Sequence, residues 1–384
     1  MIINYNHSAV GHEMISYISS HGNGDKSTIT DLKSLFAFGD IFGCRGPINR
    51  LENYKFCFNF QHTTIPDISL MKPLSFAEAS LRTAEDMWRF VGSRELVLYW
   101  SGGYDSTAAI ISLAQTNENW KQQLKILTTP YATETEYPWF YHNMLNGVEV
   151  TVDNPDIIFH PSIIDTNKIY TSGACGDQLF GCTSLTQLSS DIWGNHYSSL
   201  YDTDMFKKYT ADVNKDDVIG YIEKCVTDFS GPVSTINDIF WMAVFTHKWD
   251  EIKYRLHKKL LNPKNPKSFD QLRENIIAFF DSDHYQGWSL MNPDSNTSLN
   301  DWKKTIRDYI RNYTKDYDYN ANKIINDYDY KTGVWRNDNN AYGTLDKSTG
   351  DLDPADRGPT PEIITTNGIR FGDNLVLSEF NGWA

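Results

Sequence analysis

The sequence is poor in cysteine and has no long hydrophobic run. Its 384 residues contain five cysteines, an odd and scattered set without a Cys-x-x-Cys pair. This pattern argues against a zinc ribbon, an iron–sulfur cluster and a paired-thiol redox site. No apolar stretch is long enough to span a bilayer, and the first residues lack the basic and apolar regions of a signal peptide. We therefore expect a cytoplasmic protein with reduced thiols.

Positive charge is also scarce. The chain has 35 Lys and Arg against 49 Asp and Glu, a formal net charge of −14. Because contacts between basic residues and phosphates supply most nonspecific affinity for nucleic acid, this balance argues against a nucleic-acid partner, although a local basic patch would suffice for one. Aromatic residues make up 14% of the chain, which is typical of a packed globular protein.

The most informative feature present is a glycine turn between a predicted strand and a predicted helix. Residues 95–100, Glu-Leu-Val-Leu-Tyr-Trp, form the nearly continuous apolar run of a strand that is buried on both faces. Residues 101–106, Ser-Gly-Gly-Tyr-Asp-Ser, follow and lead into an apolar helix face. Gly102 and Gly103 allow the backbone to come close to an anion, and the start of the helix supplies unpaired N–H groups. The segment predicts a phosphate-binding loop.

Two other glycine-containing loops do not match this segment. It lacks the Gly-Lys-Ser/Thr ending of kinases and GTPases, and it is not the Gly-x-Ser-x-Gly elbow of hydrolases. A lone Gly-Gly pair also occurs in ordinary turns, but the full string after a buried strand favours a nucleotide site. The residues that we expect to bind ATP here are Ser101, Gly102, Gly103, Asp105 and Ser106.

The string Ser-Gly-Gly-x-Asp-Ser resembles the signature of the PP-loop ATP pyrophosphatases. Residues 172–181, Ser-Gly-Ala-Cys-Gly-Asp-Gln-Leu-Phe-Gly, resemble the Ser-Gly-Glu-Gly-Ser-Asp-Glu-Leu-Phe-Gly stretch of asparagine synthetases. Ser172, Gly173 and Asp177 fit that stretch, as do residues 179–181. The resemblance implies an asparagine synthetase-like ligase that cleaves ATP to AMP and pyrophosphate. Such an enzyme adenylates a carboxylate and passes it to ammonia or an amine, and the resemblance adds Ser172 and Gly173 to the nucleotide site.

One aspartate lies in each of the two motifs. Asp105 and Asp177 would repel each other and the phosphates unless a cation lay between them. Mg²⁺ is commonly held by one or two carboxylates together with phosphate oxygens and waters. We therefore expect both aspartates to be magnesium ligands and catalytic residues. Taken singly, either one could instead be a helix cap.

A predicted helix over residues 302–311 supplies positive charge. Lys303, Arg307 and Arg311 share one face at i, i+4 spacing, where an anion would relieve their repulsion. The stretch resembles the family's Lys-x-x-Leu-Arg segment, whose lysine contacts ATP. The resemblance therefore makes Lys303 and Arg307 catalytic, with Lys304 as the substitute if the register slips. A solvated basic helix face is the alternative interpretation.

Several positions depart from the family, among them residues 174–176, Gln178, Ile306 and Ile2. Ala174 stands where asparagine synthetases have a glutamate that transfers a proton in the amide step. The acceptor or the base must therefore differ, and Glu134 and Glu136 are weak candidates for that base. Cys175 beside Ala174 is expected to behave as a small buried hydrophobic residue. Ile2 replaces the cysteine nucleophile of the glutaminase half, so nitrogen would come as ammonia, as an amine or from a separate glutaminase partner.

Strands and helices are predicted to alternate through the middle of the chain. Ser75 to Glu78 reads as a capping box that opens a helix to about Val91. Strands are expected at 95–100, 124–129 and 148–152, with a short strand ending at Thr171. This alternation predicts an α/β fold, a doubly wound parallel sheet with its ligand at the carboxyl ends of the strands. The resemblance implies the Rossmann-type fold of PP-loop proteins, with additional helices.

Adenine would lie where the second strand ends, at Thr128 and Thr129, unless these are ordinary strand threonines. Three regions are expected: 1–74 with short strands, such as one at 54–60, then a synthetase-like ATP-binding domain at 75–330, and a tail of loops and hairpins at 331–384.

Two other functions stay open. One is a PP-loop enzyme that modifies a nucleotide base or tRNA, which should show a basic face or paired cysteines. The other is an ATP-binding protein that has lost catalysis, which would agree with Ala174.

Overall fold

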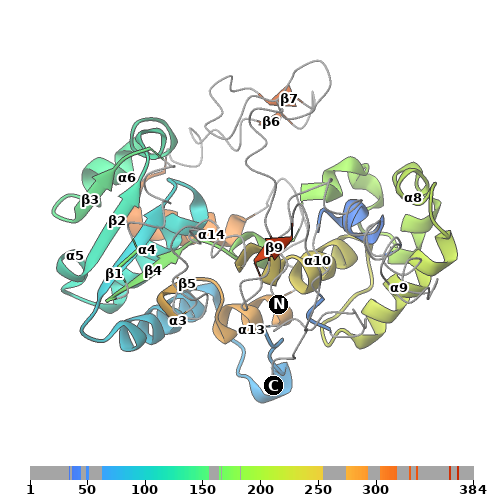
Figure 1. The fold of residues 1–384 in the computed structure, drawn as a ribbon, viewed down its shortest axis with the longest axis horizontal. Coiled ribbons are helices and arrows are strands. Elements are labelled where there is room, and N and C mark those ends of the chain that lie inside the picture. Colours follow the sequence, from blue (N-terminus) through green and yellow to red (C-terminus); the bar gives the residue numbers. More distant parts are fainter. Residues whose placement is uncertain are drawn as a thin grey trace.

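A computed structural model of the chain (Figure 1) describes most of residues 34–317 and four short strand segments beyond them. The described residues are 34, 37–44, 49–51, 63–154, 164–165, 167–181, 183–253, 274–292, 303–317, 328–329, 334–335, 363–364 and 370–371. Among them, no helix combines the length and the apolar character needed to cross a membrane.

The centre of the fold is a five-stranded sheet in which all neighbouring strands run parallel. Across the sheet the strands are ordered β3 (Glu149–Val152), β2 (Leu124–Thr128), β1 (Glu95–Trp100), β4 (Lys168–Ser172) and β5 (Ile276–Ala278). The chain runs from β1 outward through β2 to β3, then returns to the other side of β1 for β4 and β5. With helices on the sheet, this is the predicted doubly wound α/β fold, and the strand order reverses between β1 and β4.

The burial of β1 follows from its sequence. Five of its six residues are buried, as expected for a central strand that is covered on both faces. The paired strand β4 is buried at its three middle residues, whereas the edge strand β3 has no buried residue. The apolar run therefore predicted both the strand and its burial on both faces of the sheet.

Four helices pack together beside the sheet: α3 (Phe76–Val91), α4 (Tyr104–Thr116), α13 (Asp283–Met291) and α14 (Lys304–Thr314). The predicted capping box of α3 is present, with the Ser75 hydroxyl accepting from the Glu78 N–H at 3.2 Å and the Glu78 carboxylate accepting from the Ser75 N–H at 2.8 Å. The helix ends at Gly92, whose φ of 59° lies in the left-handed region. Three short elements, α5 (Trp120–Gln123), the π-helical turn η2 (Ala132–Glu136) and α6 (Pro138–Asn143), connect β1, β2 and β3.

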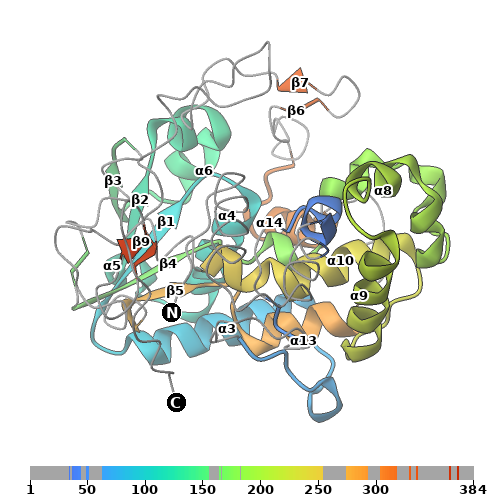
Figure 2. The same cartoon turned by 45° about the vertical axis from the view of Figure 1, so that its right-hand side comes forward.

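A second group of helices lies away from the sheet. In both ribbon views α8 (Asp204–Tyr209) and α9 (Lys215–Asp228) are separated from the strands by α10 (Ile236–His247) (Figures 1 and 2). Every residue of α10 except Asp238 is buried, because the helix is apolar on all sides. The aromatic residues of this helix are therefore part of the core. The described residues also include the short 3-10 turns η1 (Ile68–Leu70), η4 (Asp177–Leu179), η5 (Thr183–Gln187), η6 (Ser190–Ile192) and η7 (Tyr197–Asp202).

Residues 37–42 of the leading region are helical and belong to the same core. Phe38 is fully buried, and its ring lies 5.1 Å from that of Tyr221 in α9 and 4.5 Å from that of His247 in α10. The strand expected at 54–60 lies outside the described residues. In the tail, β6 (Tyr328–Asp329) pairs antiparallel with β7 (Val334–Trp335), and β8 (Ile363–Ile364) pairs antiparallel with β9 (Arg370–Phe371). The three predicted regional boundaries stay predictions.

Candidate nucleotide site

The glycine bend after β1 is shaped by its own two serines. The Ser101 hydroxyl accepts from the Gly103 N–H at 3.2 Å, and the Ser106 hydroxyl accepts from the Ser101 N–H at 3.2 Å. The two hydroxyl oxygens lie 3.1 Å apart. Gly103 is the N-cap of α4 and offers no side-chain cap, so N–H groups of the first helical turn are directed to the carboxyl end of β1. The start of a helix in such a bend is a common place for anions to bind in proteins.

Gly102 must be a glycine for two reasons. Its φ of 77° lies in the left-handed region, and a Cβ at this position would lie 2.6 Å from Cγ of Glu136 and 3.3 Å from the carbonyl oxygen of Ala132. The π-helical turn η2 therefore lies directly against the bend. This places Glu136, a weak candidate for the missing base, beside the glycine bend.

The three charged residues expected to act together do meet in space. Nζ of Lys303 lies 2.7 Å and 2.6 Å from the two carboxylate oxygens of Asp105, and 2.5 Å from Oδ1 of Asp177. The exposed fraction of the side chain is 7% for Lys303, 18% for Asp105 and 58% for Asp177. Burial alone would lower the pKa of Lys303, but the two aspartates raise it above its ordinary value, so the ammonium group stays charged.

Sheet register and two glycines bring these residues together. Parallel pairing aligns Tyr99 of β1 with Ser172 of β4, so the glycine bend and the second motif emerge at the same edge. A Cβ on Gly173 would lie 2.5 Å from the Ser106 nitrogen, and a Cβ on Gly176 would lie 2.5 Å from Cγ of Asp105. The second motif therefore packs directly onto the start of α4, and only glycine leaves room at these two positions. The Ser172 hydroxyl accepts from the Ala174 N–H at 3.2 Å and helps to shape the turn.

The prediction that Lys303, Arg307 and Arg311 share one helix face is wrong for its first member. The helix α14 begins at Lys304, and Lys303 precedes it as an N-cap with a left-handed backbone, φ 57° and ψ 23°. This backbone directs Lys303 to the aspartates, while Lys304 is exposed and is not needed as a substitute. Arg307 is half-buried, and its N–H donates to the Lys303 carbonyl at 2.9 Å. Arg311 pairs instead with Asp308 at 3.2 Å.

Arg307 also reaches the glycine bend. Burial raises the pKa of the Tyr104 phenol, and the positive charge of the nearby Arg307 opposes that shift. Tyr104 is the variable residue of the Ser-Gly-Gly-x-Asp-Ser string, so the contact joins α14 to the first turn of α4.

The two threonines expected near adenine have structural partners. Thr128 is fully buried, and its hydroxyl donates to the Trp100 carbonyl at 2.7 Å, which ties β2 to β1. The Thr129 hydroxyl accepts from the Ala132 N–H at 3.3 Å at the start of the next turn. The ordinary strand interpretation therefore accounts for the Thr128 side chain, and only the half-buried Thr129 keeps access to the edge.

Cys175 is held in an unusual backbone conformation. Its φ of 68° lies in the left-handed region, where glycine is favoured, and the asparagine synthetase stretch has glycine at this position. The thiol is buried, with Sγ 3.8 Å from the Trp249 carbonyl oxygen. Burial raises the pKa of Cys175 well above its ordinary value, and the nearby Asp281 raises it further. Burial and the raised pKa favour the protonated thiol, in agreement with the expectation of a small buried residue.

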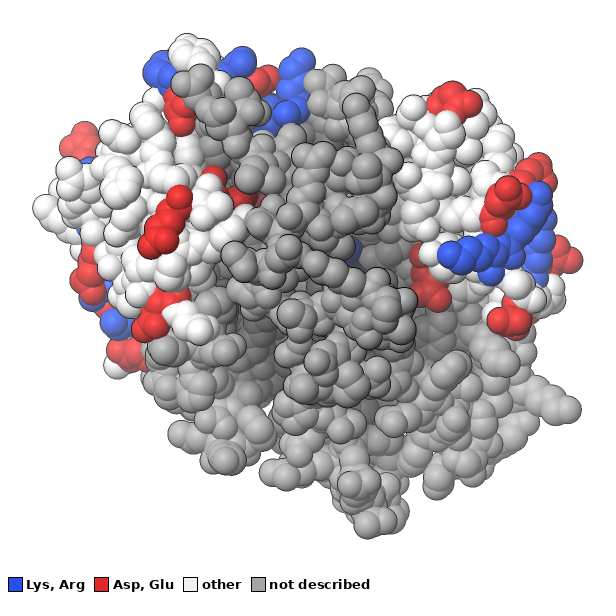
Figure 3. Space-filling view, turned by 90° about the horizontal axis from the view of Figure 1, so that it is seen from above, with Lys and Arg blue, Asp and Glu red and all other residues white. Residues whose placement is uncertain are grey.

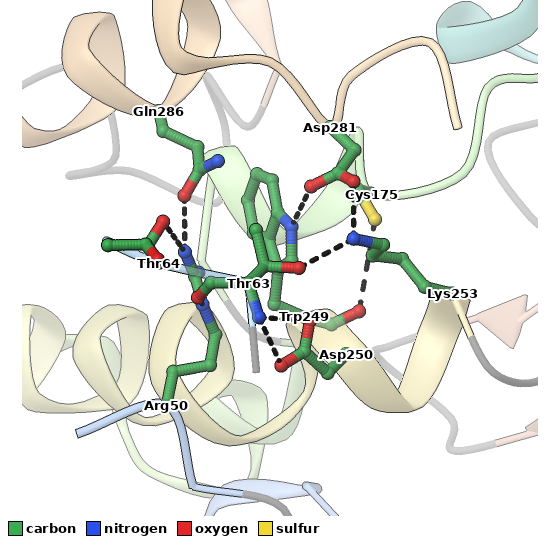
Figure 4. Close-up of polar contacts among 9 residues, drawn as sticks. All are labelled: Arg50, Thr63, Thr64, Cys175, Trp249, Asp250, Lys253, Asp281 and Gln286. Atoms are coloured by element: carbon green, nitrogen blue, oxygen red, sulfur yellow. Dashed lines mark hydrogen bonds and ion pairs between the residues drawn. The ribbon is translucent and has the colours of Figure 1, made fainter. Parts of the chain in front are cut away.

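A buried polar cluster that the sequence did not predict lies on the other side of this turn (Figure 4). Arg50 donates to the carbonyl oxygens of Thr63 at 2.8 Å and Phe245 at 2.9 Å, and to the side chain of Gln286 in α13. Its guanidinium carbon also lies 5.0 Å from the ring centroid of Trp249. Burial lowers the pKa of Arg50 to about 10, so it is a cation at neutral pH.

The acidic members of the cluster are paired. Asp250 accepts from the Thr63 N–H at 3.0 Å, and Asp281 accepts from Trp249 Nε1 at 2.7 Å. Nζ of Lys253 lies 2.5 Å from both Oδ2 of Asp281 and the Thr63 hydroxyl. The cluster thus joins the segment around Thr63 to α10 and to the turn after β5.

The donor set suits magnesium better than a transition metal. Within the described residues, no group of three or more His, Cys, Asp or Glu could hold an ion by itself. Oxygens of Asp105 and Asp177 nevertheless converge on one cation, the ammonium group of Lys303. Mg²⁺ binds through one or two carboxylates and completes its shell with phosphate and water oxygens. The two aspartates therefore fit a magnesium ion that arrives with a nucleotide.

The surface charge pattern is mixed on the face that Figure 3 shows. Basic and acidic side chains of the described residues lie next to one another at both sides of this face. The described residues on this face therefore form no broad surface of one charge.

Comparison with known proteins identifies no relative. No model of a known protein family matches the chain, and no curated protein matches it significantly. The case for a function therefore depends on the motifs and on the geometry that they form.

Proposed function

We propose that the protein is an ATP-dependent amide ligase that forms AMP and pyrophosphate and resembles asparagine synthetases. The observation that carries the proposal is the meeting of Asp105, Asp177 and Lys303 at the first turn of α4. Two carboxylates for a metal and one lysine for phosphate, beside a glycine bend, are the groups that cleavage of ATP at the α phosphate requires. The site also lies where the strand order reverses, the usual ligand position in doubly wound sheets.

The first half-reaction would adenylate a carboxylate. N–H groups of the bend and of the first turn of α4 hold phosphate oxygens, and Lys303 and Arg307 offset their charge. A carboxylate oxygen attacks the α phosphorus, and the bond between the α phosphorus and the bridging oxygen breaks to release pyrophosphate. Mg²⁺, held by Asp105 and Asp177, would neutralise the charge that builds on the departing group.

The second half-reaction would form the amide. Ammonia or an amine attacks the acyl carbon, the carbon–oxygen bond to AMP breaks, and the nitrogen loses one proton. Ala174 cannot take that proton, so a base other than the family's glutamate is required. The three described cysteines, Cys44, Cys175 and Cys225, are buried and unbridged, which agrees with a location in the reducing cytoplasm.

The test is release of pyrophosphate from ATP and Mg²⁺ in the presence of candidate carboxylic acids. We expect AMP and pyrophosphate in equal amounts, and at least about a hundredfold loss in Asp105→Asn and Asp177→Asn, since an electrostatic contact to the transition state is commonly worth this much. Asp216→Asn, at an exposed aspartate in α9, is the matched control and should keep full activity. Formation of ADP would contradict the proposal, and ATP binding without turnover would favour a protein that has lost catalysis.

A further inference from the structure

The aspartate pair holds one cation, and that cation belongs to the protein. The Lys303 ammonium group lies within 2.7 Å of three carboxylate oxygens, two from Asp105 and one from Asp177. The side chain is nearly inaccessible, with an exposed fraction of 7%. It reaches the pair from the residue before α14, whereas the aspartates belong to α4 and η4.

A metal ion cannot share this position with the ammonium group. Mg²⁺ sits about 2.0–2.1 Å from its oxygen ligands, so it would occupy the space between the same carboxylates. Two cations a few ångströms apart repel each other, and the nearly buried ammonium group of Lys303 is little screened by water. The lysine must therefore leave the pair before a metal enters.

The surrounding structure restricts how Lys303 can leave. Ile306 and Ile310 are fully buried and hold α14 in place. The movement must then occur in the flexible side chain, and the ammonium group needs an anion at its new position to offset the lost pairing. The glycine bend is where the phosphates of a nucleotide would supply one.

We propose that Lys303 is the resident counter-cation of the Asp105–Asp177 pair and excludes divalent metal until a nucleotide draws it away. The nucleotide half of this inference rests on the proposed function, while the exclusion of metal does not. The nucleotide and the metal ion then bind cooperatively, because the nucleotide draws Lys303 away from the aspartates that bind the metal ion. Lys303 exchanges its ion pair with the aspartates for one with the phosphates, and the site can then bind the metal ion.

The experiment measures Mn²⁺ binding to the nucleotide-free, full-length protein by electron paramagnetic resonance at constant pH. In the wild type we expect no Mn²⁺ binding that depends on Asp177. Lys303→Met keeps the length of the side chain and removes its charge, so it should bind Mn²⁺ at least about tenfold more tightly than the wild type, the equivalent of one charge interaction. Lys303→Met combined with Asp177→Asn should lose that binding again.

Two further variants separate the inference from general effects of charge. Lys207→Met removes an exposed lysine of α8 and should bind Mn²⁺ as the wild type does. Lys303→Arg keeps the positive charge and should still exclude the metal. The melting temperature of Lys303→Met should rise when Mn²⁺ is added, because the ion replaces the missing partner of two aspartates.

Mn²⁺ that binds the wild type and is lost in Asp177→Asn would overturn the inference, and this result needs no folded lysine variant. A folded Lys303→Met protein that binds no additional Mn²⁺ would overturn it as well. The Mn²⁺ measurement is made without nucleotide. Its result therefore does not depend on whether the protein releases pyrophosphate in the separate assay. The two proposals can therefore fail independently.

Discussion

Gly176 lies directly against the carboxylate of Asp105. A Cβ at position 176 would lie 2.5 Å from Cγ and 2.8 Å from Oδ1 of that aspartate. The glycine leaves the space in which Asp105 turns to Lys303, so a residue of the second motif decides the position of a residue of the first.

Gly176→Ala should therefore move Asp105 away from Lys303. We expect a loss of about 1–3 kcal/mol in the free energy of unfolding, as for other substitutions that overfill a packed site. Urea denaturation measures this loss. Gly220→Ala is the control, because Gly220 is an exposed position of α9 with open space around its Cα. There alanine should stabilise the helix by about 0.5–1 kcal/mol. Equal changes in unfolding free energy for the two alanine variants would contradict the close packing of Gly176 against Asp105.

The left-handed backbone of Cys175 predicts an unusual order of stability among small substitutions. Cys175→Ala removes the buried sulfur and keeps the strained backbone, whereas Cys175→Gly relieves a strain of about 1–2 kcal/mol. We expect the glycine variant to be the more stable of the two in urea denaturation. At an unstrained buried cysteine such as Cys225 in α9, glycine should be less stable than alanine. Alanine ahead of glycine at both positions would show that the backbone at 175 is not strained.

Thr128→Val separates the sheet role of this residue from a role in adenine binding. The substitution removes the hydroxyl that donates to the Trp100 carbonyl, and we expect a loss of about 1 kcal/mol in unfolding free energy. The affinity for ATP, measured by calorimetry, should stay unchanged because the side chain is fully buried. A large loss of ATP affinity without a loss of unfolding free energy would instead support the predicted contact between Thr128 and adenine.

Arg50→Met should strongly destabilise the protein. The variant removes the donor to three backbone carbonyls and to Gln286, and leaves the nearby Asp250 and Asp281 without that compensating charge. Breaking a buried charge network in this way typically costs about 3–5 kcal/mol. Arg89→Met, at an arginine of α3 whose side chain is 75% exposed, should cost less than about 1 kcal/mol. Arg50→Lys should not restore the loss, because lysine lacks the planar set of donors.

Much of the α/β core was predictable because its signals are local. The apolar run of β1 and the capping box of α3 involve residues within one turn or one strand of each other. The alternation of these segments was enough to predict a doubly wound sheet. The limits of α14 were predicted less well, since the left-handed backbone of Lys303 depends on its distant aspartate partners and not on its neighbours.

The buried cluster around Arg50 had almost no sequence signal. Its partners are separated by up to 236 residues, and single charged or amide residues show no periodicity that would mark them as buried. Only contacts across the folded chain distinguish Arg50 from an exposed arginine.

Residue chemistry was sufficient to predict the glycine bend and the edge of the sheet where it lies, because strand, motif and helix start are continuous in the chain, whereas the second acidic position came from the resemblance to asparagine synthetases. It did not reveal that the cation between Asp105 and Asp177 is a lysine of the protein. That ion pair joins residues 198 positions apart, and it forms because strand register and the packing of α14 bring them to one point. Such a contact depends on distances in three dimensions, which residue types along the chain do not encode locally.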